Sequence, residues 1–242
     1  MTSPFSLRGK TALVTGANTG IGQAIAVSLA KAGAHVIAAG RSSCAETVEM
    51  TKGEEIHLDF ADPMAARDVF SGRPIDILVN NAGIIRRADS TDFTEADWDD
   101  VIDVNLKAVF FTCQSFAKAA FVRSASAKIV NIASLLSFQG GIRVPSYTAS
   151  KHGVAGITKL LANEWAAKGI NVNAIAPGYI ETNNTEALRA DAGRSAEILS
   201  RIPAGRWGRA EDIGDAAVFL ASSAANYIHG TILNVDGGWL AR

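Results

Sequence analysis

The amino-acid sequence predicts an α/β fold built on a doubly wound parallel sheet. Seven short runs rich in apolar residues recur along the 242 residues, and most are apolar throughout, which is typical of strands covered on both faces. The stretches between them carry apolar residues at helical spacing, and crossovers of that length imply right-handed parallel connections. The candidate strands are 11–15, 35–39, 55–60, 76–81, 128–134, 170–177 and 231–238.

Composition favours one domain over the whole chain, 1–242. With 48% hydrophobic and 19% charged residues, the chain can bury one large core. A formal net charge of -1 gives no general attraction to nucleic acid or to an anionic membrane, and no apolar run approaches the length of a membrane span. We therefore expect neither a nucleic-acid partner nor a membrane partner.

Cysteine and histidine usage indicates a reduced protein without a metal site. Cys44 and Cys113 are the only cysteines and lie far apart, and no histidine stands near another ligand at metal-binding spacing. The N-terminus lacks the apolar core of a signal peptide, so we expect a cytoplasmic protein.

The first candidate strand runs into a glycine-rich turn, TGANTGIG, and then into a helical stretch. Glycines let the main chain approach a pyrophosphate, whose charge is met by the free amides of the helix N-terminus. This strand, turn and helix predict a single Rossmann-type domain that binds a dinucleotide. The expected contacts of the turn are Gly16, Asn18, Thr19, Gly20, Ile21 and Gly22.

Tyr147 and Lys151 are separated by one helical turn in SYTASKHG, so their side chains share a face. Hydride transfer at a carbinol carbon must be matched by proton transfer at its oxygen, and a phenol can carry that proton. A nearby ammonium and an oxidised nicotinamide would lower the phenol pKa from its usual value of ~10. The pair predicts an acid/base centre.

Ser134 ends the fifth candidate strand, at the edge where ligands bind in open α/β sheets. Its hydroxyl could stabilise charge on the substrate oxygen. Ser137, three residues later, is the nearest alternative.

Together these motifs resemble the short-chain dehydrogenase/reductase family. Asn80-Asn81-Ala82-Gly83 follows the fourth strand, Pro177-Gly178 follows the sixth, and the resemblance runs from about Leu7 to the VDGGW region. It implies that Asn105 holds a water linked to Lys151, that Lys151 also reaches the nicotinamide ribose, and that the protein is a homotetramer. The further cofactor contacts that it implies are Tyr147, Asp59, Phe60, Asn81, Ala82, Gly83, Pro177, Gly178, Ile180 and Thr182.

The choice of cofactor depends on the end of the second strand. Relatives that prefer NAD usually carry an acidic residue there, whereas this chain has Gly40 followed by Arg41. An arginine suits a 2′-phosphate, although it can also stack on adenine and tolerate NAD. We expect NADP or NAD, with NADP favoured.

A long polar segment, 178–206, is weakly periodic and is predicted to be a lid over the substrate. The stretches NNAGIIRR, SFQGGIRVPSYTASKHG and PGYIETNNTEALRAD resemble a branch of the family that acts on sugar acids. A hydroxylated carboxylate needs a cation and several hydrogen bonders. The predicted substrate contacts are Ser134, Gln139, Arg143, Tyr147, Tyr179 and Asn184, with Arg86 and Arg87 as alternative cations.

Two other functions remain open. A 3-oxoacyl-thioester reductase of the same family would favour an apolar lid and a basic patch for its carrier. A non-catalytic dinucleotide sensor would have no need of Ser134, Tyr147 and Lys151 together.

Overall fold

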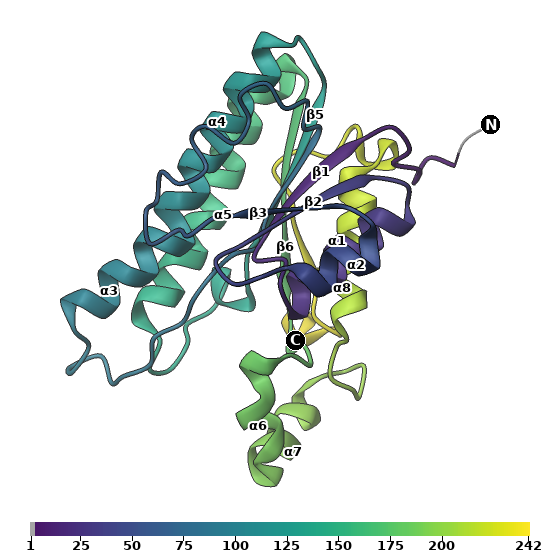
Figure 1. Cartoon of the computed structure of the whole chain (residues 1–242). Coiled ribbons are helices and arrows are strands. Elements are labelled where there is room, and N and C mark those ends of the chain that lie inside the picture. Colours follow the sequence, from purple (N-terminus) through teal and green to yellow (C-terminus); the bar gives the residue numbers. More distant parts are fainter. Residues whose placement is uncertain (1–2) are drawn as a thin grey trace.

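A computed structural model describes residues 3–242, apart from the side chain of Asn184. Its centre is one sheet of seven parallel strands in the order β3-β2-β1-β4-β5-β6-β7, as predicted (Figure 1). The order reverses direction beside β1, which is the doubly wound arrangement. The strands are β1 Thr11–Thr15, β2 His35–Gly40, β3 Glu54–His57, β4 Ile77–Asn80, β5 Ala127–Ile132, β6 Ile170–Pro177 and β7 Ile232–Val235.

Helices cover both faces of the sheet, so most strands are buried on two sides. One apolar cluster lies between the sheet and α1 and α8, and a second lies between the sheet and α4 and α5. The α-helices are α1 Gly20–Lys31, α2 Ala45–Thr51, α3 Glu95–Ile102, α4 Ala108–Val122, α5 Pro145–Trp165, α6 Glu186–Ala190, α7 Ala192–Arg201 and α8 Ala210–Ala221. Short 3-10 turns include η2 Leu135–Ser137 and η6 Trp239–Ala241, and a π-helical turn, η1, spans Asp103–Lys107.

The crossover from β3 to β4 differs from the helix expected there. No helix forms between residues 58 and 76. Residues 60–72 form successive turns instead, because Asp59 and Asp62 accept hydrogen bonds from backbone amides two residues ahead. Pro63, Gly72 and Pro74 also oppose a continuous helix. The third strand accordingly ends at His57, earlier than predicted.

A buried chain of polar side chains ties the sheet to α5. Asn80 donates to Asn131 at 2.9 Å, and Asn131 donates to Thr158 of α5 at 2.9 Å. Buried polar groups are costly when unpaired, so this chain fixes β4, β5 and α5 relative to one another. Of the predicted catalytic residues, Tyr147 and Lys151 lie in α5, and Ser134 follows β5.

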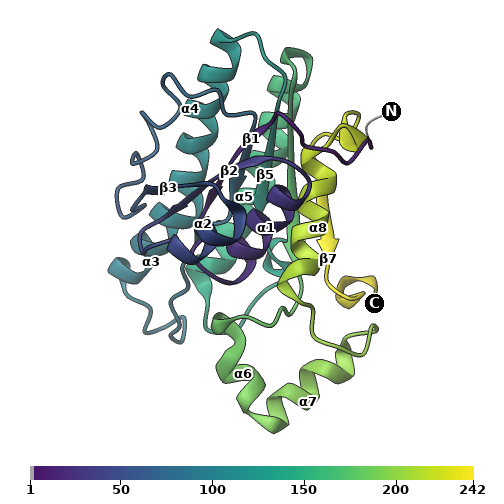
Figure 2. The ribbon, with the colours of Figure 1, turned by 45° about the vertical axis from the view of Figure 1, so that its right-hand side comes forward.

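The lid segment (178–206) projects from the carboxyl edge of the sheet as a separate lobe that contains α6 and α7 (Figure 2). Its two ends are joined, since the Glu181 amide donates to the Gly208 carbonyl at 2.8 Å and the Gly208 amide donates to the Tyr179 carbonyl at 2.9 Å. The segment is therefore a closed loop with a paired base.

Candidate active site

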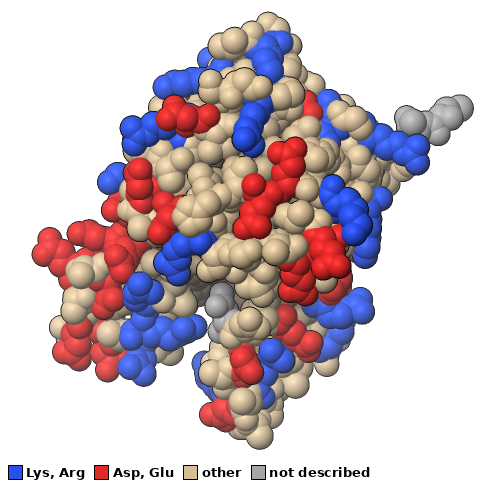
Figure 3. Space-filling view, in the orientation of Figure 1, with Lys and Arg blue, Asp and Glu red and all other residues tan. Residues whose placement is uncertain are grey.

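The predicted site residues come from the carboxyl ends of neighbouring strands. The turn after β1, the Asn81 loop after β4, Ser134 after β5 and Pro177-Gly178 at the end of β6 all lie along one edge of the sheet. Figure 3 shows the molecule hollowed between the lobe of α6 and α7 and the body, with Lys and Arg side chains at one rim. Motifs that lie far apart in the sequence are thus brought together at this edge of the sheet.

The glycine turn is shaped for close approach by a ligand. Gly16 and Gly20 have φ of 63° and 59°, and a Cβ at Gly22 would collide with the Gly16 carbonyl. Thr19 caps α1 without a side-chain hydrogen bond, and the first turn carries no acidic residue. The first amides of α1 therefore keep their affinity for an anion, which fits the pyrophosphate of a dinucleotide.

Asn81 and Thr15 hold this turn in shape. The Asn81 side-chain amide donates to the carbonyls of Thr15 and Gly16, each at 3.0 Å, while the Thr15 hydroxyl accepts from the amides of Asn81 and Ala82. The Asn81 side chain is thus engaged by the protein itself. Thr15 was not predicted as a site residue, although its place before the first glycine was a signal.

The adenosine end contains Arg41 as an exposed cation at the end of β2. A Cβ on Gly40 would approach Cys44 Sγ and the Ser42 carbonyl to 2.9 Å, so an acidic side chain does not fit there without movement. Asp59 accepts from the Ala61 amide, and Phe60 is buried in the core. Phe60 can therefore present only its main chain to a ligand.

Lys151 and Tyr147 share one face of α5, as their spacing predicts. Lys151 is 5% exposed, its Nζ donates to the Ile132 carbonyl at 2.6 Å, and it lies 5.5 Å from the centroid of the Tyr147 ring. Burial lowers the pKa of Lys151 from 10.5 to about 8. The ammonium is thus fixed by β5 beneath the phenol.

The pKa of Tyr147 in the chain by itself is governed mainly by burial. Burial raises the pKa of Tyr147 above its usual value, and the opposing effects of the Ser134 side chain and Arg87 are smaller. Within the chain alone, desolvation outweighs the nearby cations, so lowering of this pKa requires a positive charge supplied with the cofactor.

The two candidate serines have different environments. Ser134 caps η2 by accepting from the Leu136 amide at 3.2 Å, and it acts on the pKa of Tyr147. The hydroxyl of Ser137 is buried and donates to the Lys151 carbonyl at 2.7 Å. This geometry favours Ser134 as the serine that faces the substrate.

Asn105 lies in the π-helical turn η1 and is fully buried. Its amide oxygen accepts from the Ile84 amide and its nitrogen donates to the Ile84 carbonyl, both at 2.8 Å. The side chain therefore holds the loop after β4. Its relay role stays a prediction.

Several predicted substrate residues are already engaged. Arg143 pairs with Asp89 at 3.1 Å, and Gln139 accepts from the Trp239 indole at 3.4 Å. Tyr179 packs against the rings of Trp207 and Trp239. Asn184 lies outside the described side chains.

Of the two alternative cations, Arg86 is neutralised by Asp97 and Asp100. Arg87 is exposed, lowers the pKa of Tyr147 and has no ion pair within the described part of the chain. It is the better placed cation for a bound carboxylate.

The start of the lid segment reaches the glycine turn. Thr182 Cγ2 lies 3.5 Å from where a Cβ on Gly20 would stand, and a Cβ on Gly178 would lie 2.6 Å from Asp236 Cα. Ile180 is buried at the paired base of the lid segment. This part of the chain, Pro177 to Thr182, thus follows the sheet edge toward the turn, and its contacts with a cofactor stay a prediction.

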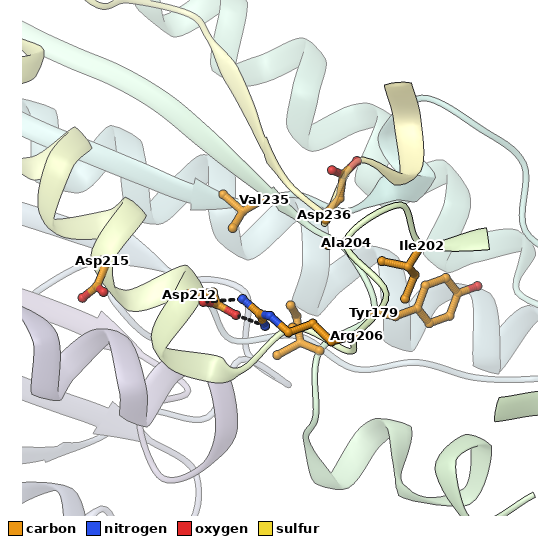
Figure 4. A pocket seen from close by; sticks show the side chains of 11 residues that line it. Tyr179, Ile202, Ala204, Arg206, Asp212, Asp215, Val235 and Asp236 are labelled. Atoms are coloured by element: carbon orange, nitrogen blue, oxygen red, sulfur yellow. Dashed lines mark hydrogen bonds and ion pairs between the residues drawn. The ribbon is translucent and has the colours of Figure 1, made fainter. Parts of the chain in front are cut away.

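A cavity of about 310 Å³ lies beside this base (Figure 4). Arg206 forms two hydrogen bonds with Asp212 across it, at 2.8 and 3.2 Å. The pair is satisfied internally and braces the end of the lid segment against α8.

Across residues 3–242, no group of three or more His, Cys, Asp or Glu side chains is arranged to hold a metal ion. In the same range, no helix has the length and apolar character required to cross a membrane.

Comparison with known proteins identifies the family. The model of a family described as enoyl-(acyl carrier protein) reductase matches residues 16–240. The chain belongs to this family of short-chain dehydrogenases/reductases.

Its relatives include sugar-acid enzymes of full length. It is 57% identical to the 2-dehydro-3-deoxy-D-gluconate 5-dehydrogenase of Bacillus subtilis, covering 98% of this chain and 97% of the relative. It is 54% identical to the enzyme of the same name from Escherichia coli, covering 99% of each. A crystal structure from Agrobacterium tumefaciens, assigned as a 2-deoxy-D-gluconate 3-dehydrogenase with bound NADP, has 70% identity and a TM-score of 0.98 over 99% of this chain and 100% of its own.

Replacing Tyr147 with Phe should lower turnover by at least about 100-fold, because the ring keeps its packing but loses the exchangeable proton. NADPH affinity, measured by fluorescence titration, should stay close to that of the wild type. Turnover within a few-fold of the wild type would exclude Tyr147 as the proton carrier.

Replacing Lys151 with Met should reduce activity and stabilise the fold near pH 7 by about 1 to 2 kcal/mol, because the removed cost of a buried charge exceeds the cost of leaving the Ile132 carbonyl without its donor. The native pKa of about 8 lies below the usual 10.5, so the unfolded chain holds more protons between these values. Burial of the Lys151 ammonium therefore lowers the unfolding free energy of the wild type below about pH 8, and this destabilisation disappears as the pH rises toward 10.5.

Urea unfolding at about pH 7 and about pH 10 measures this effect. The advantage of Lys151→Met should shrink at the higher pH. Lys159→Met, at an exposed position of the same helix, is the control and should show no such pH dependence. If Lys151→Met were more stable than the wild type by the same amount at both pH values, the lowered pKa of Lys151 would be wrong.

Proposed function

We propose that the protein is an NADP(H)-dependent dehydrogenase that interconverts a secondary alcohol and a ketone on a sugar acid. Its relatives' names point to 2-dehydro-3-deoxy-D-gluconate or 2-deoxy-D-gluconate as the substrate. The observation that carries the proposal is the arrangement of Tyr147, Lys151 and Ser134 at the sheet edge, with the exposed Arg87 as a further cation that acts on Tyr147. An acid/base centre with an adjacent cation suits an alcohol whose chain also bears a carboxylate.

The chain's residues have separate roles in the proposed reaction. When bound, the nicotinamide dinucleotide supplies or accepts the hydride. Tyr147 gives a proton to the substrate oxygen in reduction and removes it in oxidation, and Ser134 donates a hydrogen bond to the same oxygen. Lys151, held at the Ile132 carbonyl, adds positive charge that favours the phenolate.

Arg87 is the proposed partner of the substrate carboxylate. Arg143 is less suited because Asp89 already neutralises it, and Arg86 is paired with two aspartates. A carboxylate on Arg87 would anchor the sugar acid at one end and leave its hydroxyl carbons near Tyr147.

The 3-oxoacyl-thioester reductase is the competing function. The matching family is described by an enoyl reductase, which also acts on a carrier-bound acyl group but reduces a carbon–carbon double bond and not a ketone. The lid segment argues against the competing function. Ile198 is buried, and Leu188 and Leu199 pack with it against a cluster that contains Trp207 and Trp239. The remaining described lid side chains are mostly exposed and polar, so they offer an acyl chain little apolar surface.

An assay panel separates the two functions. Sugar acids and acyl thioesters are offered with each cofactor, and nicotinamide absorbance is followed. We expect turnover of the sugar acids. Faster turnover of the thioesters would overturn the proposal, and no turnover of any substrate would favour a dinucleotide sensor.

We also propose a cytoplasmic homotetramer. The free, buried thiols of Cys44 and Cys113 suit a reducing compartment. Gly156 is exposed in the middle of α5, and a Cβ there would meet no described atom within 4 Å. A mid-helix glycine costs roughly 1 kcal/mol, which close approach by a second copy would justify. Sedimentation analysis that finds a monomer would contradict the assembly.

Arg87→Gln should raise KM for the sugar acid by at least about tenfold, the effect of losing one charge-assisted hydrogen bond. KM for an uncharged substrate of the same chain length should stay unchanged. Arg143→Gln is the matched control, since Asp89 already neutralises that guanidinium. A larger increase in the control than in Arg87→Gln would assign the carboxylate to Arg143.

Arg41→Ala should weaken NADPH binding by roughly 1.5 to 3 kcal/mol and leave NADH binding nearly unchanged, because only NADPH carries the 2′-phosphate. Dissociation constants for both cofactors in both proteins provide the measurement. Equal losses for NADPH and NADH would show that Arg41 acts on adenine and not on the phosphate.

A further inference from the structure

Ser137 links the turn after the catalytic strand to the catalytic helix. It is the last residue of η2, the three-residue turn that follows Ser134. Its side chain is 8% exposed, and its hydroxyl donates to the main-chain carbonyl of Lys151 at 2.7 Å. Such a hydroxyl is turned inward, so it is available to the protein and not to a substrate.

A second contact joins the same two elements on the other side of Ser134. The Lys151 ammonium donates to the carbonyl of Ile132, two residues before Ser134, at 2.6 Å. Ser134 therefore lies between two residues, Ile132 and Ser137, that each form a hydrogen bond with Lys151. We call these two hydrogen bonds the anchors of the turn. One turn earlier on the same helix is Tyr147, which must act on the same substrate oxygen.

The turn between these anchors depends on Ser134 itself. The Ser137 amide donates to the Ser134 carbonyl at 2.9 Å, and the Leu136 amide donates to the Ser134 hydroxyl oxygen at 3.2 Å. The direction of the Ser134 hydroxyl is thus set by the shape of η2. Without the Ser137 bond, η2 keeps the packing of Leu135 but loses this hydrogen bond to α5, so its backbone can shift relative to α5 and carry the Ser134 hydroxyl with it.

We propose that Ser137 is a positioning residue for the reaction: by binding the Lys151 carbonyl, it holds Ser134 in the orientation in which its hydroxyl and the Tyr147 phenol reach one substrate oxygen. The contribution to catalysis passes through Ser134. Misplacement of a reacting group by a fraction of an ångström to one ångström is enough to reduce turnover severely.

A double-mutant cycle tests this dependence. Ser137→Ala in the wild-type background should lower kcat about tenfold or more, with the dissociation constant of NADPH unchanged. In a Ser134→Ala background the same change should lower kcat by less than about twofold, because the group being positioned is already absent. Ser137→Thr, which keeps a hydroxyl, should recover most of the lost turnover.

Thr112→Val is the control for removal of a buried hydroxyl. Thr112 lies in α4, is 1% exposed, and its hydroxyl has no hydrogen-bond partner within the described residues. Its loss should leave kcat unchanged. If Ser137→Ala does not fold, Ser137→Cys preserves the volume with a much weaker donor and replaces it in the cycle.

The proposal would be overturned if Ser137→Ala lowered kcat by the same factor in the wild-type and Ser134→Ala backgrounds. It would also be overturned if Ser137→Ala had the kcat of the wild type. The cycle is run with whichever substrate of the panel turns over fastest. Failure of the sugar-acid proposal is therefore distinguishable from failure of the role of Ser137.

Discussion

One buried ammonium constrains the whole site. Lys151 is almost fully removed from water, and its pKa falls to about 8 because of that burial. An unpaired buried charge would cost several kcal/mol, so its Nζ must stay on the Ile132 carbonyl. That requirement fixes α5 against β5, and with them the separation of Tyr147 from Ser134. The arrangement lowers stability locally and provides a defined reaction geometry, as is common where function requires a buried charge.

The turns at the cofactor end of the site are also held by buried or partly buried polar side chains, but these side chains are neutral. The Thr15 hydroxyl and the Asn81 amide satisfy the backbone of two turns that follow neighbouring strands. Their side chains are used to shape the protein, and the main chain of the glycine turn is left for the ligand. Both ends of the site therefore contain polar residues whose first partners are other parts of the chain.

The lid segment is organised by packing. Tyr179, Trp207 and Trp239 form one aromatic cluster at its base, and Leu135, next to Ser134, belongs to the same cluster. The lid base, the C-terminal turn and the catalytic strand are thus packed as one body. The glycine turn and the pair of Tyr147 and Lys151 lie along the sheet edge, whereas Arg87 and the lid segment lie on loops, where sequence is least constrained by the fold.

The sequence by itself determined the strand number, the parallel sheet, the glycine turn and the pairing of Tyr147 with Lys151, because each follows from local spacing or from apolar runs. It misjudged residues 58–76, where aspartate side chains and prolines compete with a helix. It named an ammonium and a nicotinamide as the groups that lower the pKa of Tyr147, and the structure adds that desolvation raises this pKa in the chain by itself. Only the tertiary structure decided that Arg143 meets Asp89, that Arg87 is left to act on Tyr147, and that Ser137 faces Lys151. These outcomes depend on contacts between segments far apart in the chain, and no local pattern specifies which of several polar side chains will be neutralised when the segments meet.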